Sequence, residues 1–291
     1  MHAVLVAEVD PVADRDEWLE HRKGGLGGSD AASMLGLNRN QSPFNLWLEK
    51  TQPDLGDDDA GEAAFWGKLH EPTMADQYAE RRYPRVAVWE PAGLYRHPAH
   101  HFMLATPDRW VAAETDQPEW LLEIKTTGEY QGSAWWHDIP HPALLQVHHY
   151  LTVTGLPFAD LAVLIGGNKY RDPLTLPHLR VMANADMSAV LIERERAFWS
   201  LVETLTPPAL DDTESTAEAL SRMYFEAEAD QAVDLPDTAA ALLAELASVK
   251  QSQKELDSTR EGMESQLKAW LGSAERGEIG GLPAVTWKSP K

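Results

Sequence analysis

The spacing of apolar residues predicts helices toward both ends of the chain and strands in its middle. Near the N-terminus, Phe44, Trp47 and Leu48 recur at the i, i+3, i+4 spacing of one helix face. Helices are predicted over residues 15–23, 31–35, from 43 onward, 63–82, 142–154 and 187–204. Pro72 lies inside the fourth stretch, so we expect a kink there or the start of a second helical segment.

Short apolar runs separated by turn residues fill the middle of the chain and indicate strands. These strands are predicted over residues 86–89, 93–97, 103–106, 109–112, 121–125, 161–165 and 179–182. Helices come first, a meander of strands follows, and a helix–strand–helix segment comes after it. This order predicts an α/β fold with a central mixed sheet flanked by helices.

The Pro207-Pro208 pair marks the predicted domain boundary, between residues 1–207 and an acidic, mainly helical extension over 208–291. In the extension, apolar residues fall seven apart at Leu242, Val249, Leu256, Met263 and Trp270. The positions between them include Gln253 and Arg260, which disfavours a long coiled-coil dimer. We therefore expect this helix to pack on the first domain or on a partner, and we expect a terminal strand over 282–288.

Composition restricts the class of protein. The chain has 291 residues, 43% of them hydrophobic, and 11 Trp, which indicates a folded globular protein. No apolar run reaches the length of a membrane span, about 18 residues, and the N-terminus lacks a signal-peptide pattern. We therefore expect a cytoplasmic protein without a membrane anchor. The absence of cysteine excludes disulfides, thiolate zinc sites and iron–sulfur clusters.

The net charge of −21 argues against tight non-specific DNA binding, because nucleic-acid binders usually present a basic surface. The acidity is uneven, since residues 208–264 contain 14 Asp and Glu against 4 Lys and Arg. A metal-dependent active site itself needs carboxylates, and a bound cation reverses the local field. The charge is therefore compatible with a DNA-processing enzyme.

Asp108 and the triplet Glu123-Ile124-Lys125 are the strongest candidates for chemistry. Because side chains alternate along a strand, Glu123 and Lys125 share one face while Leu122 and Ile124 point into the core. Two carboxylates and a backbone carbonyl suit Mg²⁺, or Mn²⁺, which polarises a phosphoryl oxygen and acidifies bound water. On these residues alone, a solvated hairpin with a weak Glu–Lys pair is the more common explanation.

The wider sequence resembles a known family. The blocks that carry the resemblance are GLGGSDAASMLGL (25–37) with SPFNLWLEKT (42–51), WGKLHEP (66–72), TPDRW (106–110), LLEIKTT (121–127), IPHPALLQVHHYLTVTG (139–155) and LAVLIGG (161–167). In this order they resemble the YqaJ-like viral recombinase family, which includes phage lambda exonuclease, within the PD-(D/E)XK nuclease superfamily. The resemblance covers about residues 15–205.

The resemblance implies roles for the residues of the strand-rich middle. Asp108 and Glu123 become metal ligands, together with the backbone carbonyl of Ile124, and Lys125 becomes the catalytic lysine. Glu71 matches the helical acidic residue that completes the metal environment.

The resemblance also implies roles outside the strands. Gln146 and Tyr150, four residues apart on one helix face, match an element that lines the site. Arg22 and Ser29 match a basic residue and a serine that hold a terminal DNA phosphate. Without the family, a Gly-rich cap in which Ser29 serves its own helix is the more common explanation of the block. Arg109 departs from the family, which usually has Gly after the aspartate, so we expect a slightly different hairpin or an added phosphate contact.

The activity that the resemblance implies is that of a metal-dependent deoxyribonuclease. It would digest linear double-stranded DNA ends from 5′ to 3′, leave 5′-phosphates and generate single strands for phage-type recombination. A homo-oligomer is implied too, because the lambda enzyme is a ring-shaped trimer, and so is a single-strand annealing protein as partner. A ring with a positive inner face would also fit the acidic charge. The alternatives are an endonuclease of the same superfamily in repair or restriction, or a non-catalytic adaptor that binds through residues 208–291.

Overall fold

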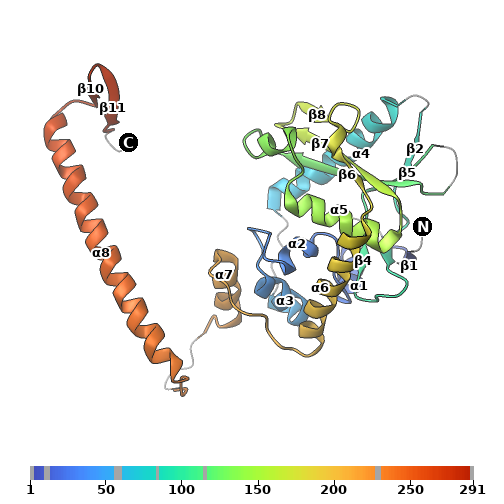
Figure 1. Cartoon of the computed structure of the whole chain (residues 1–291), viewed down its shortest axis with the longest axis horizontal. Helices are drawn as coiled ribbons and strands as arrows, with labels where there is room; N and C mark the ends of the chain where they lie inside the picture. The colour runs from blue at the N-terminus through green and yellow to red at the C-terminus, as the bar shows by residue number, and fades with distance from the viewer. Residues whose placement is uncertain are drawn as a thin grey trace. The chain divides into compact units, whose positions relative to one another are not determined.

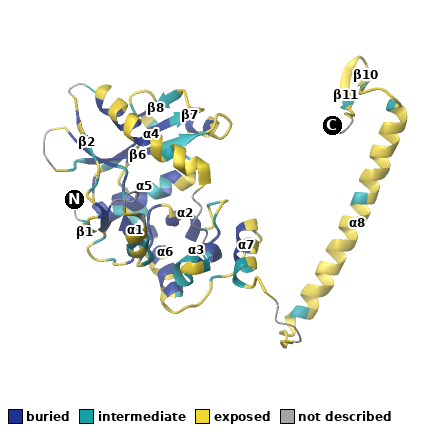
Figure 2. Cartoon of the chain, turned by 180° about the vertical axis from the view of Figure 1, so that it is seen from behind, coloured by how far each residue is buried: buried dark blue, intermediate teal, exposed yellow. Residues whose placement is uncertain are grey.

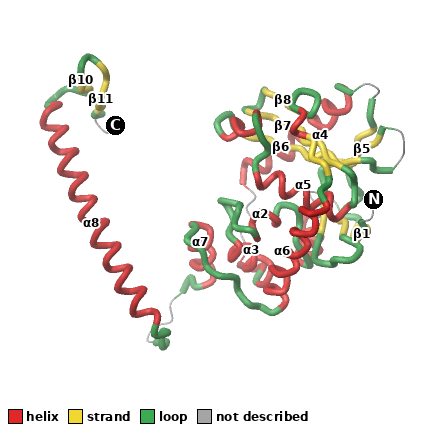
Figure 3. Tube along the Cα trace, viewed as in Figure 1, coloured by secondary structure: helices red, strands yellow, loops and turns green. Residues whose placement is uncertain are grey.

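The structure is a computed structural model that describes residues 3–9, 14–55, 61–82, 85–113, 117–226 and 231–288. The chain divides after Glu226 into two compact units, each of which is described by itself. The first unit combines helices with a twisted sheet, and the second contains a long helix and a hairpin (Figure 1, Figure 3).

The first unit contains the helices predicted from the apolar spacing, each within two residues of its expected start. They are α1 (Arg15–Lys23), α2 (Asp30–Met34), α3 (Pro43–Thr51), α4 (Gly61–Glu80), α5 (His141–Thr154) and α6 (Ala185–Glu203). Local chemistry sets their ends: the Ser42 hydroxyl accepts a hydrogen bond from the Asn45 amide at the start of α3, and Gly155, with φ of 68°, ends α5. Pro72 lies inside α4, which continues through it as one helix.

The central sheet is mixed, as predicted. Its strands lie in the order β2-β5-β6-β7-β8, and β9 also pairs with β7. They are β2 (Ala87–Trp89), β5 (Arg109–Ala112), β6 (Trp120–Thr127), β7 (Phe158–Ile165), β8 (Lys169–Arg171) and β9 (Arg180–Met182). β6 and β7 are parallel, because α5 connects them, and the other pairs are antiparallel. A smaller sheet joins β1 (Val4–Ala7), β3 (Leu94–Arg96) and β4 (Leu104–Ala105); strands β1 and β8 were not predicted.

Helices cover both faces of the central sheet. On one face, Met74 and Tyr78 of α4 pack on Leu122 and Ile124 of β6. On the other face, α5 packs on Leu121 and its neighbours in a larger core that also includes α2, α3 and α6 (Figure 2). This alternation along β6 places Glu123 and Lys125 on the face covered by α5.

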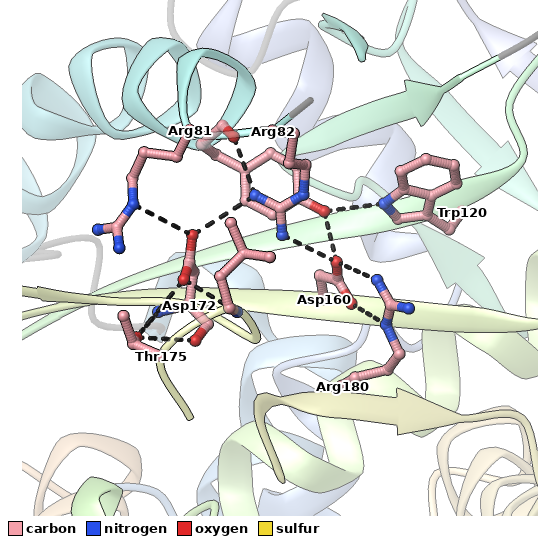
Figure 4. A network of polar contacts seen from close by, with 9 residues as sticks. Arg81, Arg82, Trp120, Asp160, Asp172, Thr175 and Arg180 are labelled. Carbon is pink, nitrogen blue, oxygen red and sulfur yellow. Dashed lines mark hydrogen bonds and ion pairs between the residues drawn. The ribbon is translucent and has the colours of Figure 1, made fainter. Parts of the chain in front are cut away.

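A buried ion-pair network fastens α4 to β7 (Figure 4). Asp160 of β7, fully buried, accepts hydrogen bonds from the Tyr78 hydroxyl (2.5 Å) and from Arg82 just after α4 (3.3 Å). Arg180 of β9 donates to both oxygens of Asp160 at 2.7 and 2.9 Å, and Trp120 donates to the Tyr78 hydroxyl at 2.9 Å. The network fixes the helix that carries Glu71.

The first unit continues past the predicted boundary at Pro207-Pro208. Helix α7 (Glu214–Met223) packs on α3, where the Ser215 hydroxyl accepts hydrogen bonds from the Ser42 amide and the Asn45 side chain, both at 3.0 Å. The prolines follow the end of α6, but the amphipathic helix after them buries its apolar face on the first unit. The observed division therefore lies after Glu226, where the prediction had residue 207.

The second unit consists of α8 (Thr238–Leu271) and a hairpin of β10 (Arg276–Ile279) and β11 (Leu282–Thr286), which includes most of the predicted terminal strand. No described residue of α8 is buried, and Figure 2 shows the helix exposed along nearly its whole length. The heptad residues lie on the surface of this unit, and the packing of α8 on the first domain or on a partner stays a prediction. None of the described helices combines the length and apolar character needed to cross a membrane.

Candidate active site

The candidate site lies where β6 runs beyond the end of β5. The pairing of these strands stops at Arg109 opposite Leu122, while β6 continues to Thr127. The next amide of β6 that would bond to β5, that of Ile124, donates to the Asp108 carboxylate at 2.8 Å. N–H and C=O of one strand residue point to the same side, so the Ile124 carbonyl also faces the side of Asp108.

Glu123, Lys125 and Gln146 form a hydrogen-bonded triangle between β6 and α5. The Lys125 ammonium donates to Glu123 Oε1 at 2.7 Å and to Gln146 Oε1 at 2.9 Å. The Gln146 amide donates to the same Glu123 oxygen at 2.7 Å. Glu123 is only 2% exposed, which contradicts the solvated-hairpin explanation. Its second oxygen, Oε2, is buried and has no hydrogen-bond partner among the described residues.

Asp108 is part-buried in an acidic environment. Burial, together with the Glu123 and Glu71 carboxylates, raises the pKa of Asp108 well above its usual range, although Lys125 and the Ile124 amide act in the opposite direction. Burial lowers the pKa of Lys125, but Glu123 and Asp108 outweigh it and raise that pKa above its usual value. Lys125 is therefore held as a cation beside two carboxyl groups.

Glu71 comes from the opposite face, on α4, and is paired with other groups. Arg109 donates to Glu71 Oε1, and Lys68 donates to its two oxygens at 3.1 and 2.9 Å. Arg109 also donates to the Asp108 backbone carbonyl at 2.6 Å. The resemblance left Arg109 unexplained, and the structure gives it a defined place as the buried partner of Glu71.

The Gly-rich block forms a second polar cluster. The Arg22 guanidinium donates to the Ser29 hydroxyl at 2.7 Å and to the Asp30 carboxylate at 2.6 Å. Lys50 of α3 lies 3.0 Å from the other Asp30 oxygen, which also accepts from the Gly27 amide at 2.9 Å. Ser29 precedes α2, but its hydroxyl makes no capping bond, so the alternative explanation that Ser29 caps this helix is wrong. Its hydroxyl is oriented by Arg22.

Gly28 brings this cluster against α5. A Cβ atom at Gly28 would lie 2.6 Å from the Tyr150 ring and 2.9 Å from Gln146 Cγ. Tyr150 in turn accepts a hydrogen bond from the Gln146 amide at 3.2 Å. Only glycine allows this close approach, so both clusters border the same stretch of α5.

The predicted site residues thus form two neighbouring groups. Asp108, Glu123, Lys125 and Gln146 come together at β6, and Arg22 and Ser29 lie across Tyr150 from them. Sequence reasoning missed Asp30 and Lys50, which hold Arg22 in place. Both lie inside the quoted family blocks. Their pairing joins residues twenty positions apart, so no local pattern in the sequence indicates it.

The donor chemistry at β6 fits a hard divalent cation. The unpartnered oxygen of Glu123, the Asp108 carboxylate and the Ile124 carbonyl supply the oxygen ligands that Mg²⁺ and Mn²⁺ prefer. Across the described residues, no cluster of three or more His, Cys, Asp or Glu side chains is arranged to hold a metal. The carboxylates that this site offers to a cation are therefore those of Asp108 and Glu123, because Glu71 is paired with Arg109 and Lys68.

Known proteins resemble this chain over the region that contains the candidate site. The model of the YqaJ-like viral recombinase domain matches residues 17–157, a range that includes the Gly-rich block, the β6 triplet and Gln146. The YqaJ protein of Bacillus subtilis (strain 168) is 35% identical over 278 residues, covering 94% of this chain and 83% of that protein.

Solved structures show the same fold. An alkaline exonuclease from Laribacter hongkongensis superposes with a TM-score of 0.54 at 21% identity, covering 66% of this chain and 94% of that chain. The same exonuclease in complex with dAMP gives a TM-score of 0.52 at 20% identity, again covering 66% of this chain and 94% of that chain. The predicted PD-(D/E)XK fold, a mixed sheet between helices, is confirmed.

Proposed function

The chain belongs to the YqaJ-like viral recombinase family, and from this premise we propose that it is a metal-dependent deoxyribonuclease that degrades double-stranded DNA from its ends, 5′ to 3′. One observation carries the proposal. A buried Glu123 with an unpartnered oxygen lies beside Asp108, and a lysine is hydrogen-bonded to the same glutamate. Carboxylates for a cation and a fixed ammonium group are the components that phosphodiester hydrolysis needs.

Asp108, Glu123 and the Ile124 carbonyl would hold the metal. When bound, Mg²⁺ or Mn²⁺ supplies a Lewis acid for the phosphoryl oxygen and lowers the pKa of bound water. Lys125 orients the attacking water and offsets the negative charge that develops on the phosphoryl oxygens. Gln146 fixes Lys125 and Glu123 relative to each other, because it bonds to both.

The Arg22 cluster is suited to a terminal phosphate. Arg22 and Lys50 bring two cations to one carboxylate, Asp30, and the Glu49 carboxylate is near enough to act on both cations. Arg22 holds the Ser29 hydroxyl, and hydroxyl and guanidinium groups are good phosphate donors. A 5′-phosphate bound here would place the end of a strand beside Tyr150 and Gln146. The solved structure of the Laribacter hongkongensis exonuclease in complex with dAMP, a nucleoside monophosphate, is in keeping with this chemistry.

The decisive experiment compares linear 5′-phosphorylated duplex DNA with supercoiled circular DNA, each incubated with the purified protein and Mg²⁺. We expect the linear DNA to be degraded and the circle to stay intact. Lys125→Ala should reduce degradation by about 10³-fold or more while the melting temperature stays close to that of the wild type. Lys254→Ala, an exposed lysine of α8, is the matched control and should degrade DNA normally.

The same assay separates the alternatives. Cutting of the circle would instead identify an endonuclease of this superfamily. Binding to DNA without degradation, with Mg²⁺ and also with Mn²⁺, would identify a non-catalytic adaptor.

The phosphate site has its own test. Ser29→Ala removes a hydroxyl that caps no helix, so the fold should be unaffected. We expect the variant to degrade 5′-phosphorylated and 5′-hydroxyl ends at more similar rates, and Arg22→Ala to lose the preference more completely. An unchanged preference in both variants would place the phosphate elsewhere. A homo-oligomer and a single-strand annealing partner remain part of the proposal, to be tested by sedimentation and by copurification.

A further inference from the structure

Arg109 is a buried cation within the candidate active site. The residue is 5% exposed, although it begins a strand at the edge of the site. Its guanidinium bonds to the Glu71 carboxylate and to the Asp108 carbonyl, and it lies 3.0 Å from Glu90 Oε1. A guanidinium that is always charged and presents several fixed donors suits such a position.

Glu71 has no free oxygen in this arrangement. Its Oε1 accepts from Arg109 and Lys68, and its Oε2 accepts from Lys68. Glu71 is 6% exposed, so two cations compensate one buried carboxylate. Asp108 and Glu123 differ from it, because Glu123 is the one of the two that Lys125 bonds to, and Glu123 Oε2 has no partner among the described residues.

The strand register places Arg109 and Glu123 on opposite faces of the sheet. Arg109 pairs with Leu122, whose side chain packs against α4, the helix that carries Glu71. Glu123 is the next residue of β6 and bonds to Gln146 on α5, across the sheet. Arg109 and Glu71 therefore bond on the face opposite to the unpartnered oxygen of Glu123.

We propose that Arg109 serves as the permanent counter-cation of Glu71 and keeps that carboxylate away from the metal. A single divalent ion then binds between Asp108 and Glu123, with Glu71 outside its coordination sphere. The inference rests on the metal-dependent function proposed above, and it makes Arg109 a positioning residue that sets the number of metal ligands.

The test is titration of the full-length protein with MnCl₂ in the absence of DNA, followed by calorimetry and by the paramagnetic resonance of free Mn²⁺. The wild type should bind one ion. Asp108→Asn should weaken Mn²⁺ binding by about 10- to 100-fold, because it alters a metal ligand. Glu71→Gln should change Mn²⁺ binding by no more than about 3-fold, because Glu71 lies outside the coordination sphere.

Removal of the Arg109 charge should release Glu71. In Arg109→Gln we expect about 10-fold tighter Mn²⁺ binding or a second bound ion, because a buried carboxylate that has lost its buried counter-cation, and keeps only the part-exposed Lys68, favours a metal. The double variant Arg109→Gln/Glu71→Gln should return to the affinity of the wild type. Arg109→Lys, which keeps the charge, should resemble the wild type.

Three outcomes would contradict parts of this account. Equal loss of affinity in Glu71→Gln and Asp108→Asn would make Glu71 a ligand and overturn the inference, while the nuclease proposal would stand. Equal tightening in Arg109→Gln with and without the Glu71 carboxylate would overturn it too, because the cation would then act by general repulsion. If the wild type bound no Mn²⁺ at all, the metal-dependent function itself would fail. Circular dichroism melts establish that each variant is folded, and if Arg109→Gln is not, Arg109→Met carries the same comparison.

Discussion

At the scale of single residues, the position of Lys125 depends on two neighbours. Glu123 and Gln146 both accept from its ammonium group, and the Gln146 amide also donates to Glu123. Each member of this triangle restrains the other two, so the lysine is oriented before any substrate arrives. Such preorganisation is worth more in a buried site than in water.

Gln146→Leu tests this restraint. The change keeps the size of the side chain but removes one acceptor from Lys125 and one donor from Glu123, so we expect DNA degradation to fall by about 10- to 100-fold. Thr152→Val on the same helix, where the hydroxyl bonds to Ser188 away from the site, is the control. Steady-state rates on linear duplex DNA measure the effect, and equal rates for both variants would show that Gln146 does not position the lysine.

At the scale of elements, two buried polar contacts hold the helices that carry the site. His149 of α5 bonds to Glu195 of α6 (2.8 Å) and to the Leu104 carbonyl of β4 (2.7 Å), and both side chains are fully buried. On the other face, Asp160 holds α4 through Tyr78 and Arg82. These contacts fix α5 and α4 on opposite sides of β6.

The His149 contact predicts a dependence of stability on pH. Burial alone lowers the pKa of His149, but Glu195 and the Leu104 carbonyl outweigh it and raise that pKa above about 6.5, the ordinary value. Because the folded-state pKa is the higher one, the stabilisation is complete below about pH 6.5 and is lost as pH rises through the folded-state pKa.

Urea unfolding of the wild type and His149→Gln measures this effect. The difference in free energy of unfolding between the two proteins should be larger at about pH 6 than at alkaline pH. A constant difference across this range would mean that His149 stays neutral in the fold. His148→Gln, whose ring lies next in sequence and has its pKa lowered by burial, is the matched control and should not reproduce the trend.

The Asp160 network predicts a large loss of stability. Asp160→Ala leaves Arg82, with a side chain 9% exposed, as a buried cation short of one partner, and the Tyr78 hydroxyl without its acceptor. We expect a loss of about 3–5 kcal/mol in the free energy of unfolding. Glu129→Ala, which breaks an exposed pair with Lys169, should cost less than about 1 kcal/mol. Denaturant unfolding compares the two, and similar losses would show that Asp160 contributes no more than a surface pair.

At the scale of the whole molecule, the chain consists of two compact units, one with the nuclease fold and one made of a long helix and a hairpin. The first unit, up to Glu226, contains all of the predicted site residues and both buried networks. The second contains α8, where apolar side chains such as Leu256 and Trp270 are exposed at 71% and 75%. The division predicts that the first unit folds by itself.

A protein ending at Glu226 tests the division. Because the first unit is compact by itself, the shortened protein should melt within about 3 °C of the corresponding transition of the full chain and degrade linear DNA at a similar rate. A shortened protein that ends at Pro207 instead is the contrast. It lacks α7 and so exposes the apolar residues that α7 covers on α3, and it should be clearly less stable. Equal stability of the two would remove α7 from the folded unit.

The sequence by itself determined the features that depend on neighbours along the chain. Helix and strand positions followed from periodicity, and the shared face of Glu123 and Lys125 followed from strand alternation, because both patterns are local. The family blocks determined the fold and the identity of the candidate residues.

Only the tertiary structure decided how those residues are paired. That Glu123 is buried against α5, that Glu71 is bound by Arg109, and that Asp30 joins Arg22 to Lys50 all depend on contacts between separate elements. The same holds for the domain boundary, since α7 returns to α3 after the two prolines. Such contacts are set by packing and by the compensation of buried charge, which no periodicity in the sequence records.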